Sequence, residues 1–245
     1  MLKIALIGYG QMGNLIEQLA SQNDCEIVSI IDPTLGNEIT TQTVADADVC
    51  IEFSTPDAAF ENIVKLIELN KNIITGTTGW FDNLDKVKLM VEKKGTGFIY
   101  GSNFSVGMNL FFSIIESAAK LMNKAEDYDL FGLEMHHNKK KDSPSGTAKV
   151  LSEIILQNID RKTKVQYDKL DRKIEQDELH FTSVRSGDIP GTHSISFDSE
   201  VDTIELKHTA RNRNGLALGA IKAAKWLNNK TGFYNFTDNL NKIIG

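Results

Sequence analysis

A glycine-rich turn between a strand and a helix constrains the fold of this chain more than any other feature. An apolar run over residues 3–7 leads directly into Gly8-Tyr9-Gly10-Gln11-Met12-Gly13, and a helical pattern continues to Ala20. A second apolar run, residues 27–31, ends in Asp32, 19 residues beyond Gly13. In such an arrangement the first glycine allows the tight turn, the second lets the backbone approach a pyrophosphate, and the third lets the helix pack on the strand. The sequence therefore predicts a Rossmann unit that binds a dinucleotide.

Asp32 also bears on which nicotinamide cofactor is used. A carboxylate at this place accepts hydrogen bonds from the adenosine ribose and repels a 2′-phosphate. The next residues, Pro33-Thr34-Leu35, supply no arginine to receive such a phosphate. We therefore predict NADH as the preferred cofactor and NADPH as the alternative.

Predicted strands and helices alternate as far as residue 100. The predicted strands are 49–53, 72–75 and 97–100, the predicted helices are 56–70 and 82–94, and residues 36–47 are mostly loop. This alternation is typical of a doubly wound parallel sheet, here of five strands, with ligands beyond the carboxyl ends of the strands. Three later loops at that edge are expected to contact the cofactor: Ser54 and Thr55; Gly76, Thr77 and Thr78; and Gly101, Ser102, Asn103 and Phe104.

The pattern changes from Gly107 onward. The predicted elements are a helix over 107–122, a strand over 128–135, a helix over 146–158, strands over 179–185, 192–197 and 203–208, and helices over 214–227 and 236–244. Strands without intervening helices favour an antiparallel or mixed sheet. We expect an α/β protein: a Rossmann-like dinucleotide-binding domain, residues 1–106 and 212–245, plus an α+β domain with a mixed sheet for substrate binding and oligomerisation, residues 107–211.

A second candidate site lies between Glu134 and Ala148. This stretch carries two histidines and three lysines between a predicted strand and a helix that starts at Ser145-Gly146-Thr147. Cations and a helix N-terminus together favour an anion, and imidazoles move protons near neutral pH. We expect no metal, because adjacent histidines on a strand point to opposite faces and no His-Glu-x-x-His motif or cysteine pair completes a ligand set.

The composition limits the classes of partner that this protein can bind. The net charge of −6 disfavours nucleic acid or an anionic membrane as the main partner, although the three lysines can still bind a small anion. The N-terminus lacks a signal-peptide pattern, and no stretch is apolar enough for a membrane span. Cys25 and Cys50 lie within apolar strand patterns and form no disulfide framework. We therefore expect a cytoplasmic protein with reduced thiols.

The second candidate site also carries a family resemblance. The pattern Glu134-Met135-His136-His137-x-x-Lys140-x-Asp142-x-Pro144-Ser145-Gly146-Thr147-Ala148 resembles the signature of the 4-hydroxy-tetrahydrodipicolinate reductase family, also called dihydrodipicolinate reductases, of bacterial and plant lysine and diaminopimelate biosynthesis. Further stretches match family motifs in the expected order: Gly76-Thr77-Thr78-Gly79, 102–107, and Arg185-x-Gly187-Asp188-x-x-Gly191-x-His193. The resemblance covers nearly the whole chain.

The resemblance implies roles for individual residues. His136 would be a proton donor or acceptor and Lys140 the proton donor. His137 would contact the substrate, and Gly146 with Thr147, in the turn that Ser145 begins, would hold a substrate carboxylate. The family's reaction is hydride transfer from nicotinamide C4 to (2S,4S)-4-hydroxy-2,3,4,5-tetrahydrodipicolinate, a cyclic dicarboxylate, which gives tetrahydrodipicolinate with loss of water. Members are typically homotetramers joined through sheets of the second domain.

Some alternatives stay open at this point. Arg185 and His193 either bind substrate or only tie the loop 187–191, and turn chemistry favours the structural role. The whole chain could instead be another reductase on the same two-domain plan, such as an aspartate or homoserine dehydrogenase. It could also be a nucleotide sensor that binds NAD(H) and a partner protein, for which the site need contain no acid.

Overall fold

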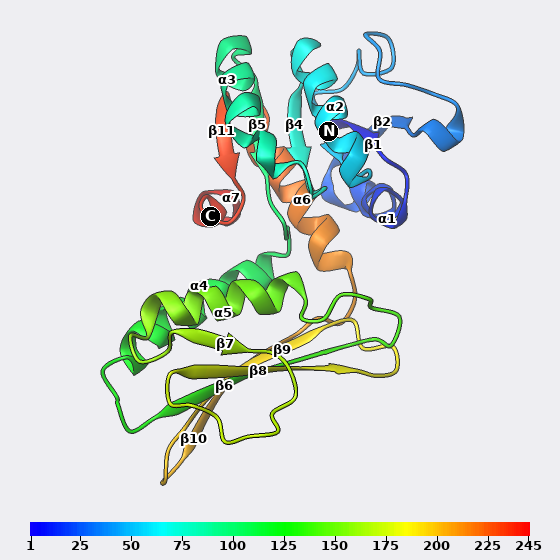
Figure 1. Cartoon of the computed structure of the whole chain (residues 1–245). Coiled ribbons are helices and arrows are strands. Elements are labelled where there is room, and N and C mark those ends of the chain that lie inside the picture. The colour runs from blue at the N-terminus through cyan, green and yellow to red at the C-terminus, as the bar shows by residue number, and fades with distance from the viewer. The chain divides into compact units, whose positions relative to one another are not determined.

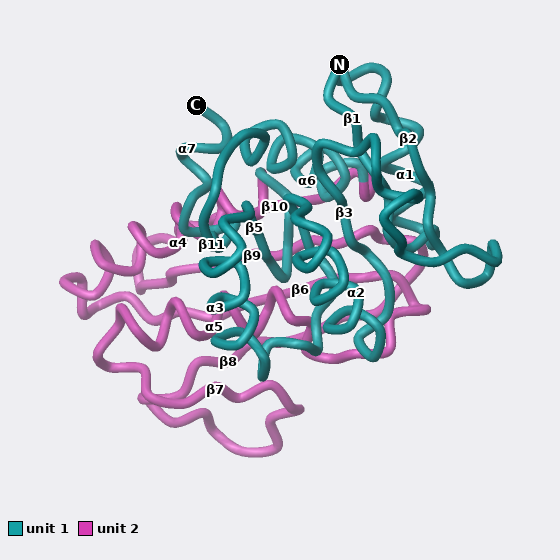
Figure 2. Tube along the Cα trace, turned by 90° about the horizontal axis from the view of Figure 1, so that it is seen from above, with its two compact units in different colours: residues 1–106, 214–245 teal, residues 107–213 magenta.

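The chain divides into two compact units that are discontinuous in sequence. The computed structural model describes all residues, 1–245. Unit 1 comprises residues 1–106 and 214–245, and unit 2 comprises residues 107–213 (Figure 2). The chain thus leaves unit 1 after Val106 and returns at Asn214, two residues later than expected.

Unit 1 is built on a parallel sheet of six strands in the order β11-β5-β4-β3-β1-β2 (Figure 1). The strands are β1 (Leu2–Ile7), β2 (Cys25–Ile31), β3 (Val49–Glu52), β4 (Asn72–Thr75), β5 (Gly97–Tyr100) and β11 (Gly232–Asn235). The helices are α1 (Gln11–Ala20), α2 (Pro56–Glu68), α3 (Leu84–Lys94), α6 (Asn214–Leu227) and α7 (Leu240–Ile244). Helices α1, α6 and α7 contribute to one apolar cluster and α2 and α3 to another, and alternate β1 residues point into each. The prediction of a doubly wound parallel sheet is confirmed.

The prediction of five strands in this sheet is wrong, because β11 adds a sixth. Its four residues are too few to show a clear period, although Phe233 and Tyr234 pack into opposite apolar clusters as alternate strand residues do. The last helix also starts at Leu240 rather than at Phe236. The Asn235 side chain accepts the N–H groups of Thr237 and Asp238, and this turn occupies residues that a helix would otherwise use.

Unit 2 is a mixed sheet of five strands in the order β10-β9-β6-β8-β7, covered on one face by two helices (Figure 1). The elements are α4 (Val106–Met122), β6 (Asp129–His136), α5 (Gly146–Asn158), β7 (Lys164–Gln166), β8 (Glu178–Arg185), β9 (Thr192–Asp198) and β10 (Thr203–Thr209). The predicted mixed sheet is confirmed. Strand β7 was not predicted, because three residues at a partly exposed sheet edge leave no apolar period.

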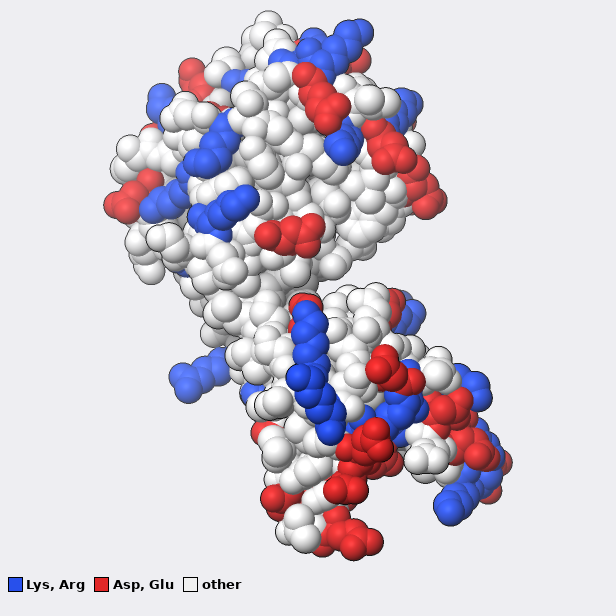
Figure 3. Space-filling view, turned by 90° about the vertical axis from the view of Figure 1, so that its left-hand side faces the viewer, with Lys and Arg blue, Asp and Glu red and all other residues white.

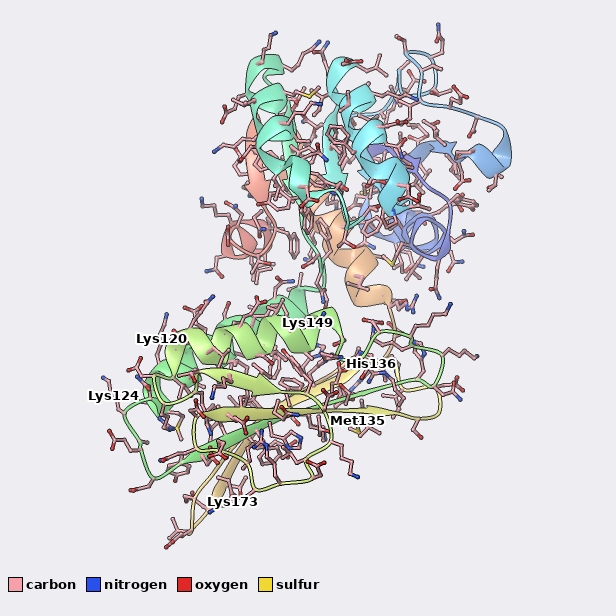
Figure 4. All side chains as sticks on the ribbon, in the orientation of Figure 1. Lys120, Lys124, Met135, His136, Lys149 and Lys173 are labelled. Atoms are coloured by element: carbon pink, nitrogen blue, oxygen red, sulfur yellow. The ribbon has the colours of Figure 1, made fainter.

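Strand β6 places two side chains of the candidate site on the sheet face that the helices of unit 2 cover. Its even-numbered residues from Leu130 to His136 are buried, and its odd-numbered residues are more exposed. Figure 4 marks His136 and the preceding Met135, which point to opposite sides of the sheet. Gly132 is required in this row, since a Cβ there would lie 2.3 Å from the Phe181 ring. The row therefore ends with Glu134 and His136 inside unit 2.

The surface is mixed in charge. Basic and acidic side chains are interspersed on both units over the face that Figure 3 displays. No helix combines the length and hydrophobicity that crossing a membrane requires.

Candidate functional site

The three glycines of the first turn have different surroundings, as their separate roles require. Gly8 has a φ of +92°, and a Cβ there would meet the Phe53 carbonyl oxygen at 2.3 Å. A Cβ on Gly13 would lie 2.4 Å from the Gly8 carbonyl oxygen. A Cβ on Gly10, by contrast, would meet nothing within 4 Å. Open space at the N-terminus of α1 is what a pyrophosphate needs to reach the backbone N–H groups.

These surroundings predict opposite effects for two substitutions. Gly13→Ala forces backbone apart and is expected to lower the free energy of unfolding by about 1–3 kcal/mol, the usual cost of overpacking. Gly10→Ser should leave stability unchanged, because serine caps a helix at least as well as glycine. Its side chain would fill the open space, and we expect NADH to bind about tenfold more weakly, a loss of ~1.4 kcal/mol.

Urea denaturation and fluorescence titration with NADH measure the two effects separately. Gly10→Ser protein that binds NADH as tightly as the wild type would contradict the assignment of this turn to the cofactor.

Asp32 is held in place by its own neighbours. One carboxylate oxygen accepts the Tyr9 N–H at 2.7 Å, and the other accepts the N–H and hydroxyl of Thr34 at 2.8 and 2.6 Å. These hydrogen bonds, that of the Thr34 side chain first, lower the pKa of the Asp32 carboxyl. The oxygen bonded to Tyr9 keeps a lone pair that can accept a ribose hydroxyl.

Asp32 opens into a cavity of about 480 Å³ beyond the carboxyl ends of β1, β2 and β3. Strand β1 lies between β3 and β2, so the strand order reverses at β1. The edge beyond such a reversal is where open α/β sheets bind ligands. Gly8 and Gly10 line the cavity, as do Ser54 and Thr55 from the loop that we expected at this edge. Other lining side chains were not predicted: Phe53, Ala58, Glu61, Asn62 and Lys65. Its size and its mixed apolar and polar walls fit the adenosine half of a dinucleotide. The α2 residues were missed because they lie at helical spacing in an amphipathic helix whose pattern predicts only packing.

A buried carboxylate, Glu52, organises the neighbouring loops. It accepts hydrogen bonds from the hydroxyls of Ser54, Thr75 and Thr77 and from the Ser54 N–H. Thr77 is thus buried with its hydroxyl engaged, whereas Thr78 is exposed. Of the predicted cofactor residues in this loop, Thr78 has the hydroxyl that a ligand can reach. Gly76 has no room for a side chain, since a Cβ would lie 2.1 Å from the Phe53 ring.

The other predicted cofactor residues divide in the same way. Tyr9 has its hydroxyl bonded to Glu17, and Gln11 and Met12 lie in the first turn of α1. Gly101 and Ser102 follow β5, and Asn103 accepts the Ser105 N–H through its side chain. Phe104 is buried, with its ring centroid 4.6 Å from that of Phe236. The Phe104 ring therefore belongs to the core, and only its backbone can face a ligand.

In unit 2, the start of α5 presents unpaired N–H groups. The Ser145 hydroxyl caps the helix by accepting the Ala148 N–H at 3.1 Å, and the Ser145 N–H donates to Glu134. Ser145 is buried, so its polar groups serve the turn itself. The N–H groups of Gly146 and Thr147 precede the first intrahelical bond and have no partner within the helix. These two groups are the ones that an anion can bind.

Glu134 joins the strands around this turn. Its Oε1 accepts the Ser145 N–H, the Ser183 hydroxyl at 2.7 Å and the Arg185 guanidinium at 2.8 Å. Its Oε2 lies 3.4 Å from His136 Nδ1 and 3.5 Å from His193 Nε2. Arg185 also donates to the Asp142 carbonyl, which ties β8 to the loop before α5. Arg185 and His193 thus make structural contacts, but these hold Glu134 and the loop before α5 rather than the loop 187–191 that we predicted.

Burial and neighbouring charges set the protonation of this group. Burial lowers the pKa of the His136 imidazole to about 4, and Glu134 opposes the shift only in part. Burial alone would raise the pKa of the Glu134 carboxyl, but the polar groups around it, His193 first, hold it well below its usual range. At neutral pH the site therefore contains an ionised Glu134 and a neutral His136.

The two remaining predicted residues lie in the loop that follows β6. His137 donates its N–H to the Ile189 carbonyl at 2.8 Å, which fixes the loop against residues 187–191. The Lys140 ammonium contacts both Asp142 carboxylate oxygens, at 2.7 and 2.9 Å. Lys140 is less exposed than its neighbours Lys139 and Lys141. Unit 2 therefore brings an imidazole, an ammonium and a free helix N-terminus together on the segment 136–147.

Glu134, His136 and His193 could also be considered as metal ligands, since one ligand atom of each lies within 4.8 Å of the others. The Arg185 guanidinium, however, already balances the Glu134 charge at 2.8 Å. A divalent cation would add two further positive charges to this buried group. The donor set therefore fits a proton-bearing hydrogen-bond network better than a metal.

Comparisons with known proteins agree along the whole chain. The family model described as dihydrodipicolinate reductase, N-terminus, matches residues 2–104, and the model for the C-terminus matches residues 107–240. A 4-hydroxy-tetrahydrodipicolinate reductase from Christiangramia forsetii is 39% identical over 243 residues, which cover 99% of each chain. One from Neisseria gonorrhoeae is 38% identical over 199 residues, which are 80% of this chain and 73% of the relative.

Solved structures show the same fold. A dipicolinate-bound dihydrodipicolinate reductase from Paenisporosarcina sp. TG-14 superposes with a TM-score of 0.77 at 21% identity, over 97% of this chain and 99% of that one. An amine dehydrogenase from Mycobacterium smegmatis reaches 0.62 at 10% identity, over 97% and 95%. The two-unit plan is thus shared with other dehydrogenases, whereas the sequence matches are specific. On those matches, the chain belongs to the dihydrodipicolinate reductase family.

Proposed function

We propose that this protein reduces (2S,4S)-4-hydroxy-2,3,4,5-tetrahydrodipicolinate to tetrahydrodipicolinate with loss of water, using NAD(P)H, in lysine and diaminopimelate biosynthesis. The segment 136–147 carries the proposal, because it combines proton-transfer groups with a site for a carboxylate. Family membership supplies the substrate class. The free thiols of Cys25 and Cys50 support a cytoplasmic location.

The surroundings of each site residue in unit 2 support a specific role for it in this reaction. The N–H groups of Gly146 and Thr147 bind one substrate carboxylate, and His137 contacts the substrate from the adjoining loop. Lys140 donates a proton, and His136 exchanges one through its ring. When bound along the glycine turn and the cavity beside Asp32, the reduced nicotinamide cofactor supplies a hydride from C4. No metal takes part in this proposal.

The test is loss of absorbance at 340 nm with substrate formed in place by a synthase from pyruvate and aspartate semialdehyde. Oxidation of the cofactor that depends on the synthase is expected. Folded protein that binds cofactor but never oxidises it would point to the nucleotide sensor. Oxidation with aspartate or homoserine instead would point to another dehydrogenase.

Cofactor preference is expected to follow Asp32. An ionised carboxylate beside the ribose disfavours a 2′-phosphate, so NADH should give the higher kcat/KM. In Asp32→Ala the ratio of kcat/KM for NADH over NADPH should fall by about tenfold, which corresponds to ~1.4 kcal/mol. The same assay at limiting cofactor measures the ratio.

Glu38→Ala is the matched control, because Glu38 is an exposed carboxylate that lines the same cavity. If Glu38→Ala changes the ratio and Asp32→Ala does not, selectivity belongs to Glu38.

We also propose a homotetramer joined through the sheet of unit 2. Its two helices contribute to an apolar cluster on one face, while Phe131 and Val184 on the other are 43% and 41% exposed. A paired sheet face would bury these side chains. Light scattering should give four times the mass of 27.2 kDa, and Phe131→Glu should yield smaller species. A monomeric wild type would contradict the proposal.

A further inference from the structure

One oxygen of the buried Glu134 carboxylate lies between two imidazole rings and has no other polar neighbour to satisfy it. Oε1 is saturated by the Ser145, Ser183 and Arg185 donors described above. Oε2 is buried without a well-aligned hydrogen bond, and so is His136 Nδ1, which lies 3.4 Å away. The second imidazole neighbour of Oε2 is His193 Nε2 at 3.5 Å, which also has the Ser145 hydroxyl at 3.3 Å, whereas His136 Nδ1 faces Oε2 alone. A buried nitrogen with a carboxylate oxygen as its single polar neighbour is expected to direct a proton at it.

The charge on Glu134 decides which nitrogen of His136 carries that proton. If Nδ1 presented its lone pair, two electron-rich atoms would face each other across 3.4 Å in a buried site. If Nδ1 carries the hydrogen, the contact becomes attractive and satisfies both buried atoms. Because a neutral imidazole holds a single ring N–H, Nε2 is then left with its lone pair.

We propose that Glu134 is a positioning residue: its Oε2 keeps the proton of neutral His136 on Nδ1 and leaves Nε2 as the proton-accepting atom. This inference rests on the proposed function only for the identity of the substrate that gives its proton to Nε2. The space beside Nε2 is kept by Gly191, where a Cβ would lie 3.1 Å from that atom. Of the two ring nitrogens, only Nδ1 is buried without a hydrogen bond.

This assignment divides the proton chemistry between two residues. A neutral imidazole protonated on Nδ1 can accept at Nε2 but cannot donate from it. His136 is therefore the acceptor, and Lys140 remains the donor. Glu134 also links the acceptor to the carboxylate site, because its Oε1 binds the Ser145 N–H at the start of α5.

The experiment is nuclear magnetic resonance of the full-length protein with ¹⁵N-labelled histidine at neutral pH. The ring nitrogens of His136 are identified by their absence from a His136→Asn sample. We expect the proton on Nδ1 in the wild type. In Glu134→Gln the amide oxygen should face Arg185 and Ser145, so that the NH₂ group donates to Nδ1 and the proton moves to Nε2.

Steady-state rates complete the test. Glu134→Gln should lower kcat by about 100-fold, within the range for a misplaced tautomer or a lost general base, and leave the Kd for NADH unchanged. Ser183→Ala is the matched control, because it removes one bond to Oε1 and leaves Oε2 untouched. It should keep the proton on Nδ1 and lower kcat less than threefold.

Three results would overturn the proposal: a wild-type proton on Nε2, a Glu134→Gln variant with near-normal kcat, or a loss of kcat without a change of tautomer. The wild-type spectrum decides the first point even if Glu134→Gln fails to fold. Wild-type protein with the proton on Nδ1 but no activity on the dicarboxylate would refute the proposed function and leave the positioning role standing.

Discussion

Lys140→Ala is expected to lower kcat by about 100-fold or more, the scale of a lost general acid. The ammonium is the less exposed member of a run of three lysines, and Asp142 holds it in a fixed place beside the start of α5. Without it, the reaction loses both a proton donor and a positive charge near a dianionic substrate. His136→Ala should lose a similar factor. The synthase-coupled assay at saturating cofactor measures kcat.

The neighbours of Lys140 provide matched controls. Lys139→Ala and Lys141→Ala remove the same charge from exposed positions one residue away, and kcat should change less than twofold. Lys140→Arg keeps the charge, but its pKa above ~12 makes it a poor donor. We therefore expect the arginine variant to bind substrate with a near-normal KM and to remain slow. Normal turnover in Lys140→Ala would refute the donor role.

Arg185→Ala is expected to lower the free energy of unfolding by about 3–5 kcal/mol, the cost of leaving one partner of a buried ion pair alone. Arg185 lies 2.8 Å from Glu134, whose side chain is fully buried. The guanidinium also bonds the Asp142 carbonyl at 2.7 Å. Urea denaturation at pH 7 measures the loss. The surface pair of Lys207 and Glu205, 3.9 Å apart, is the control, and Lys207→Ala should cost less than about 0.5 kcal/mol.

The effect of Arg185 should also depend on pH in one direction. The folded-state pKa of the Glu134 carboxyl lies below its unfolded value, so ionised Glu134 contributes stability at neutral pH. That contribution is present above the unfolded pKa, near ~4.3, and is lost as the pH falls through the folded value. The difference between wild type and Arg185→Ala should therefore shrink in acid. A difference that grows in acid would contradict the pairing.

Local signals in the sequence were enough to predict the elements whose own residues mark where they begin and end. Helix α5 begins and ends where predicted, because Ser145 caps it and its apolar spacing is regular. The glycine turn could be identified because the spacing of its three glycines is a known signature. In the structure, Gly8 and Gly13 have no room for a side chain, and Gly10 borders open space. Strand β11 could not be predicted, because its place depends on pairing with β5, which lies more than 130 residues earlier in the sequence.

The same distinction applies to the candidate site. The histidines, lysines and helix start of segment 136–147 are neighbours in sequence, so their combination is visible without a structure. The function of Glu134 cannot be seen in the sequence, because its partners Ser183, Arg185 and His193 come from two other strands. Phe104 shows the opposite case: its motif predicts a ligand contact, whereas its ring is part of the core, so that the backbone is left to make this contact.

The return of the chain to unit 1 has a consequence for folding during synthesis. Nine of the twenty buried residues in the cluster that α1 shares with α6 and α7 lie after residue 213. As the ribosome releases the chain from its N-terminus, residues 1–106 cannot complete this core, whereas unit 2 already has all of its own. We therefore expect the inserted unit to fold first and the unit that begins the chain to fold last, with its exposed strands in need of chaperone protection until α6 emerges.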